Sequence, residues 1–150
     1  MADTLTHRAV AADTFNACWT LLERERSDAE DLELLELAFA SRHHWRAVGA
    51  SQQIVVADWM VARCFSALDE GVLALRFATA ALEAAPDDAP AWLRASLLEG
   101  LARAHAANGD QAARDAAVKR AATVLGEETD PEDRDLIADQ LASVPPARRA

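Results

Sequence analysis

The sequence lacks tyrosine altogether and has only two cysteines, five glycines and five prolines among its 150 residues. So few glycines argue against the glycine-rich phosphate loops and the G-x-S-x-G nucleophile elbow found in many enzymes. β-Branched residues never alternate with polar ones over a run, which disfavours strands. No apolar run approaches the ~20 residues of a membrane-spanning helix. Residues 1–10 lack the apolar stretch of a signal peptide, and we expect neither a leader nor a membrane partner.

Basic residues are also scarce. The chain has 15 Lys and Arg against 25 Asp and Glu, a formal net charge of −10. Because nucleic-acid binding depends on patches of Lys and Arg, we expect no nucleic-acid partner. The acidic residues concentrate in 23–36 and 127–139, where each run opens a predicted helix and favours the positive end of its dipole.

The two cysteines, Cys18 and Cys64, lie in apolar helical patterns and form no C-x-x-C pair. A disulfide and two buried free thiols are both compatible with this placement. We favour free thiols, which suit a reducing, cytoplasmic location.

Alanine and leucine are abundant, and both are strong helix formers. Capping residues, glycines and prolines divide the chain into about seven helices. Their expected ranges are 3–26, 27–48, 51–68, 71–85, 90–107, 110–125 and 130–143. We expect one domain over residues 1–144, followed by a frayed tail over 145–150. Apolar stripes along the helices predict that Trp19, Trp45 and Phe65 are largely buried.

Residues 54–86 have the spacing of a helix-turn-helix unit that resembles a tetratricopeptide repeat (TPR). Its packing positions hold Val61, Ala62, Phe65, Ala74, Ala78 and Ala81, and Pro86 closes the unit. The segment 90–125 matches the repeat less closely, with Arg114 and Gly126 where alanine and proline are usual. Together with the short turns, the resemblance implies an all-α, TPR-like solenoid of three helical hairpins plus a C-terminal capping helix.

A second resemblance covers about residues 10–143. It is carried by Asn16–Glu23, His44–Gly49, Asp58-Trp59, Arg63 and Ala104-His105-Ala106. These segments look like an uncharacterised group of bacterial TPR-like proteins, in which an Asn-x-x-Trp-x-Leu-Leu stretch precedes a His-Trp-x-x-Val-Gly corner. The group has no activity to transfer, so the resemblance implies a fold without naming a function.

The repeat register places Trp59 and Arg63 on the concave face, with Glu99 and Arg103 at the equivalent positions of the next hairpin. Two arginines beside a tryptophan suit a carboxylate or an extended acidic peptide, because guanidinium groups bind carboxylates bidentately. The alternative is that both arginines pair with the protein's own acids.

A second candidate site is a polar cluster of Asn16, His44 and Asp58, with His105 as a further member. Asp58 interrupts an apolar row, and a buried acid needs a partner such as a histidine. The cluster is either structural or a small-molecule, metal or catalytic site. No H-E-x-x-H motif or Cys/His ligand spacing is present, and we predict no metal, cofactor or catalytic residue.

From these patterns we expect a binding or scaffolding module that takes a protein or peptide segment in its concave groove and catalyses no reaction. The alternative is a small-molecule or metal-dependent site around His44 and Asp58. A short solenoid whose first hairpin lacks a polar outer cap leaves apolar surface open, so we also expect a homodimer.

Overall fold

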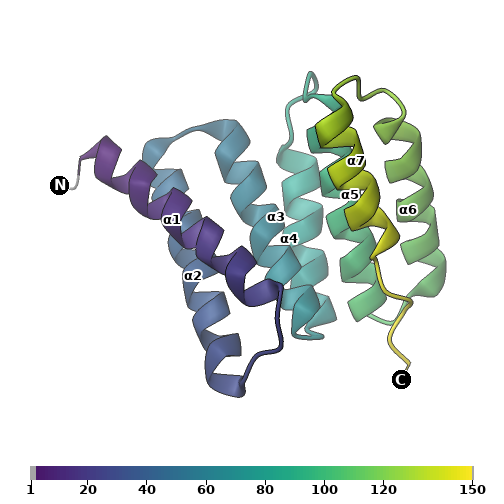
Figure 1. Ribbon diagram of the computed structural model, residues 1–150, viewed down its shortest axis with the longest axis horizontal. Coiled ribbons are helices and arrows are strands. Elements are labelled where there is room, and N and C mark those ends of the chain that lie inside the picture. Colours follow the sequence, from purple (N-terminus) through teal and green to yellow (C-terminus); the bar gives the residue numbers. More distant parts are fainter. Residues whose placement is uncertain (1–2, 150) are drawn as a thin grey trace.

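The computed structural model describes residues 3–149, and the secondary structure of this part of the chain is all helical, with seven helices and no strand (Figure 1). The prediction of an all-α protein is confirmed. The helices are α1 (Thr4–Leu22), α2 (Asp28–Val48), α3 (Ser51–Ala67), α4 (Gly71–Ala84), α5 (Ala91–Ala107), α6 (Gln111–Leu125) and α7 (Pro131–Ala142). No helix within residues 3–149 combines the length and the apolar character needed to cross a membrane.

Local signals in the sequence account for the helix ends. Ser27 and Glu30 form the predicted capping box at the start of α2, in which each side chain accepts a hydrogen bond from the other's backbone N–H. Asp110 and Asp130 cap α6 and α7 in the same way, by accepting from backbone N–H groups of the first turn. Gly49 ends α2 in the left-handed conformation, with φ of 78°.

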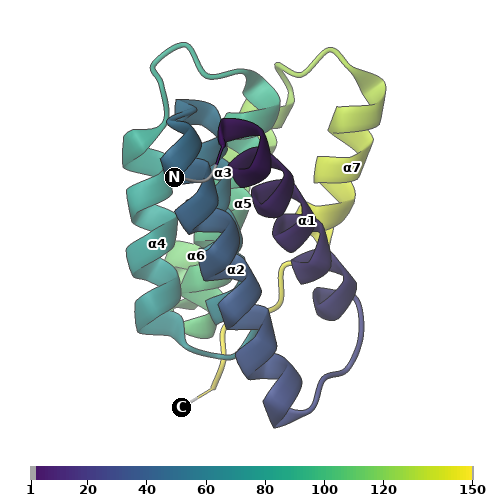
Figure 2. The ribbon, with the colours of Figure 1, turned by 90° about the vertical axis from the view of Figure 1, so that its left-hand side faces the viewer.

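The helices pack mainly against their neighbours in sequence. The most extensive contacts are between α1 and α2, α3 and α4, and α5 and α6, and α3 also lies against α5. Helix α1 contacts α3, and α7 contacts both α5 and α6. Seen from the side, α1 and α7 lie on one flank of the molecule and α4 on the other, with α3 and α5 between them (Figure 2). Along the row of helices, α1 and α7 lie toward opposite ends of that flank, with α3 and α5 between them (Figure 1).

Helix α3 forms the centre of the core because it touches α1, α2, α4 and α5. Nine of its 17 residues are buried, Asp58 among them. Phe65 is 6% exposed, as predicted. Trp19 and Trp45 are partly buried, less completely than Phe65, and Trp19 packs against the core. Both side chains border hollows on the flank where α1 lies, so part of each ring remains exposed. Cys18 and Cys64 are buried free thiols, as expected.

Two glycines permit close helix contacts. A Cβ on Gly71 would lie 2.5 Å from backbone atoms of Asn108, so the start of α4 lies directly against the end of α5. A Cβ on Gly100 would lie 2.6 Å from the indole ring of Trp59. The Cδ1–Nε1 edge of Trp59 therefore approaches α5 this closely only because position 100 has no side chain.

The C-terminal segment is docked, whereas the sequence predicted that 145–150 is frayed. Val144 is buried, and Arg114 donates hydrogen bonds to the carbonyls of Val144 and Pro145. The backbone N–H of Arg148 donates to the carbonyl of Ala106 at 2.9 Å. These long-range hydrogen bonds hold the segment against α5 and α6, and Ala150 lies outside the described residues.

We predict that Gly100→Ala lowers the free energy of unfolding by about 1–3 kcal/mol, because the rigid ring of Trp59 must move. This loss should exceed the ~1 kcal/mol that alanine gains over glycine in helix propensity. Urea denaturation measures the change. In a Trp59→Leu background the same substitution should be neutral or stabilising, and additive losses would contradict the proposed contact.

Candidate functional site

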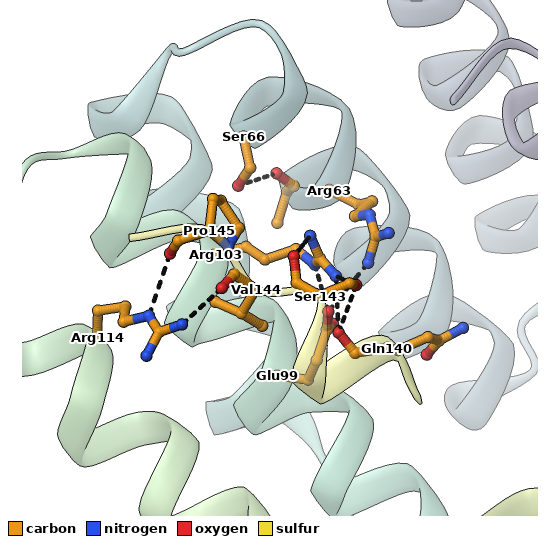
Figure 3. A network of polar contacts seen from close by, with 10 residues as sticks. Arg63, Ser66, Glu99, Arg103, Arg114, Gln140, Ser143, Val144 and Pro145 are labelled. Carbon is orange, nitrogen blue, oxygen red and sulfur yellow. Dashed lines mark hydrogen bonds and ion pairs between the residues drawn. The ribbon is translucent and has the colours of Figure 1, made fainter. Parts of the chain in front are cut away.

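Arg63 and Arg103 both pair with one buried carboxylate, that of Glu99 (Figure 3). Arg63 Nη1 lies 3.0 Å from Glu99 Oε1, and Arg103 donates from Nε to the same oxygen. Glu99 has no exposed surface, and the two arginine side chains are 15% and 11% exposed. A fully buried carboxylate requires such partners, and two guanidinium groups provide them at Oε1, while Oε2 is buried without a hydrogen-bond partner among residues 3–149.

The arginines also connect Glu99 to the outer helices. Arg103 Nη2 donates to the carbonyl of Gln140 at 2.9 Å and to Ser143 Oγ at 2.6 Å, at the C-terminal end of α7 (Figure 3). A cation is favoured there, because it complements the negative end of the helix dipole. The guanidinium carbon of Arg63 lies 5.2 Å from the ring centroid of Trp19, on α1. One buried carboxylate thus links α3 and α5 to both α1 and α7.

This pairing changes the expected role of the two arginines. The sequence predicted that Arg63 and Arg103 bind a partner's carboxylate, and the structure instead pairs them with the protein's own Glu99, the alternative considered from the sequence. Burial, the largest influence, lowers the pKa of the Arg63 guanidinium from its ordinary value, against the opposing effect of Glu99. Both arginines border a hollow of about 290 Å³ beside the docked C-terminal segment.

An apolar hollow of about 240 Å³ lies elsewhere on the flank that carries α1 and α7. We call it the aromatic trough. Its main side chains are Phe15 and Trp19 from α1, Val56 and Trp59 from α3, Trp92 from α5, and Leu136 and Ile137 from α7. A second hollow of about 250 Å³ adjoins it, since Phe15 and Val56 line both, and it extends to Trp45 and Asn16. The two hollows form a row between neighbouring helices.

The trough exposes apolar surface. Trp59 forms a buried part of its wall, 7% exposed, whereas Trp19 and Trp92 are half-buried. Leu136 is 58% exposed at the edge formed by α7. Apolar surface around a concave site marks interaction sites, and tryptophans are over-represented among the residues that dominate binding energy.

Of the four residues predicted for the groove, the trough contains Trp59 alone. Arg63, Glu99 and Arg103 form the internal network, and the analysis of the sequence missed Phe15, Trp92 and Leu136. Trp92 offered a signal, because it lies seven residues, or about two turns, before Glu99, which the repeat register places on the concave face.

The predicted polar cluster of Asn16, His44, Asp58 and His105 is not assembled. Asp58 pairs with Arg42, and Asn16 lines the second hollow. His105 Nδ1 is buried, without a hydrogen-bond partner among residues 3–149. In the same part of the chain, no three His, Cys, Asp or Glu side chains are grouped to hold a metal ion. Asp58 therefore pairs with Arg42, which lies two residues, or about half a helical turn, before the expected His44.

His44 instead lies against His7, with their Nδ1 atoms 2.7 Å apart, and its ring also contacts that of His43. One of the two Nδ1 atoms must donate and the other accept, which requires that at most one of these two rings carries a second proton. Burial, and then the proximity of His7 and His43, lower the pKa of His44 from its ordinary value. The pair joins the start of α1 to the end of α2.

Comparison with known proteins adds no further information about the site. No protein-family model, no curated protein and no solved structure matches the chain. The functional interpretation therefore depends on the hollows, their side chains and their charges.

We predict that Glu99→Gln lowers the free energy of unfolding by ~3–5 kcal/mol, because it leaves two buried arginines without their counter-charge. Glu127→Gln is the matched control, since Glu127 pairs with Arg94 at the surface with 58% of its side chain exposed. The control should cost no more than ~1 kcal/mol. Equal losses of unfolding free energy for the two variants in urea denaturation would contradict the prediction that the buried network stabilises the fold more than a surface ion pair does.

We predict that His44→Gln reduces the loss of stability on acidification. Because the folded-state pKa of His44 is lowered, the unfolded chain binds this proton more readily. The stability that neutral His44 contributes is complete above the unfolded-state pKa of ~6.5, and it is lost as the pH falls through the folded-state pKa. Thermal melts between about pH 7.5 and 5 should show a smaller decline for the variant. An unchanged slope for His44→Gln would refute the prediction.

Proposed function

We propose that this protein is a TPR-like interaction module that binds a peptide or protein segment in the aromatic trough and catalyses no reaction. The pairwise contacts α1–α2, α3–α4 and α5–α6 are those expected for three helical hairpins, and α7 packs on the last pair as a capping helix would. In such solenoids the first helices of successive pairs line the concave face. Here the trough is lined by α1, α3, α5 and α7.

The observation that carries this proposal is the set of aromatic side chains around an open hollow. Phe15, Trp19 and Trp92 are all partly exposed there, and Leu136 projects at the edge. Removing apolar surface from water stabilises a complex by ~25 cal/mol per Å², so an apolar side chain that enters the trough gains affinity. Amphipathic segments bind grooves in this way, with anchors at regular spacing.

The shape of the site favours a segment over a small molecule. Each hollow is smaller than the ~300–1,000 Å³ typical of drug-sized ligands. The two hollows follow one another along α1 and α3, an arrangement that suits successive side chains of one segment. The alternative site around His44 and Asp58 has no such support, because each of these residues has a separate partner.

Selection from a random peptide library displayed on phage tests the proposal. We expect wild type to enrich peptides with an aromatic or large aliphatic anchor, and Leu136→Ser to weaken their binding by about tenfold, the loss of ~1.4 kcal/mol of apolar contact. Leu32→Ser is the matched control, because Leu32 is 65% exposed on α2, outside both hollows. Failure to enrich any peptide, or equal binding by both variants, would contradict the proposal.

A further inference from the structure

The charges around the aromatic trough are of one sign on the side formed by α7. Asp133 lines the trough itself, and Glu132 and Asp139 flank Leu136 at helical spacings of four and three residues. Within residues 3–149 none of these three carboxylates forms an ion pair. No lysine or arginine lines the trough or the adjoining hollow.

Two of these carboxylates have a structural explanation, and the third does not. Glu132 and Asp133 lie in the first turn of α7, where a negative charge favours the helix dipole. Asp139 lies in the last turn, where a negative charge is unfavourable. Helix stability therefore does not account for an exposed carboxylate at position 139, one turn from the exposed Leu136.

The positive charges that the sequence assigned to this face are unavailable to a ligand. Arg63 and Arg103 are held by Glu99, and Arg103 also donates to the end of α7. Arg8 lies over the ring of Trp45, at the end of the second hollow away from α7. The free charge beside the trough is thus negative along α7.

From this charge pattern we propose that the segment bound in the trough is an amphipathic one with an apolar face and basic flanks, whose Lys or Arg side chains lie along α7 against Glu132, Asp133 and Asp139. This inference rests on the proposed function and adds the chemical class of the partner. The proposed partner is basic, whereas the two arginines suggested an acidic one from the sequence. Complementary charge of this kind accelerates association and excludes partners of the wrong sign.

Two synthetic helices test this charge preference. Each carries fluorescein and has the same leucines and one tryptophan on one face, and the opposite face has lysine in one helix and glutamate in the other. Fluorescence anisotropy should show that the lysine helix binds full-length protein at least about tenfold more tightly at low salt. The preference should shrink at ~0.3 M salt, where charges are screened within a few ångströms.

Variants at two positions on α7 are compared with variants at two similar positions on α2. Asp139→Asn should weaken binding of the lysine helix by about threefold without destabilising α7, and Leu136→Ser should weaken both helices. Leu32 and Glu36 provide the control, an exposed leucine followed by an exposed acid one turn later on α2. Leu32→Ser and Glu36→Gln should leave both affinities unchanged.

The outcomes separate the two proposals. If neither helix binds, the proposed function fails, and the charge inference fails with it. If both bind equally and Leu136→Ser weakens both, the trough is a binding site and the inference of a basic partner is overturned. If the lysine helix binds but neither Leu136→Ser nor Asp139→Asn affects it, attraction to the acidic chain as a whole explains the binding, and the inference is again overturned.

Discussion

The buried carboxylate of Glu99 is the constraint on which the arrangement of the outer helices depends. It fixes Arg63 and Arg103, and these two side chains extend to Trp19 on α1 and to the end of α7. Since α1 and α7 both line the aromatic trough, an internal ion network contacts two of its walls. The cost of burying these charges is offset only if all three are present together.

The same aromatic rings serve both the core and the trough. Trp59 packs on Gly100 inside the molecule and borders the hollow, and Trp19 contacts Arg63 while it stays partly exposed at the trough. Stability and binding are therefore coupled at these rings. Exposed positions such as Leu136 are the ones at which binding can change without altering the fold.

The sequence predicted best what local interactions determine. The capping box at Ser27, the turn at Gly49 and the cap at Asp110 set helix ends within a few residues, because each depends on neighbours in the chain. Long-range partners were harder to predict. The register correctly brought Arg63 near Arg103, but it could not show that Glu99 lies between them instead of facing solvent.

The remaining differences between prediction and structure concern the partner of Asp58 and the exposure of Trp19 and Trp45. Asp58 was expected to meet His44 and instead meets Arg42, on the same helix as His44, because a rotation of about half a helical turn decides which side chain faces α3. Trp19 and Trp45 lie on apolar stripes like those of core residues, and the stripe itself does not indicate whether another helix covers it. The site lies at these uncovered stripes.

The docking of α7 has a consequence for the order in which the molecule is assembled. The most extensive contacts are between helices adjacent in sequence, α1 with α2, α3 with α4 and α5 with α6, and such local contacts form quickly because little chain entropy is lost. The hydrogen bonds from Arg103 to Gln140 and Ser143 span 37 and 40 residues and form only after α7 has been synthesised. Among the seven helices of residues 3–149, α7 makes the least extensive contacts with its neighbours, and it is therefore the natural unit of local unfolding. When α7 detaches, one wall of the trough is lost while the contacts among α1 to α6 persist, so the trough is the last part of the fold to form and the first to open.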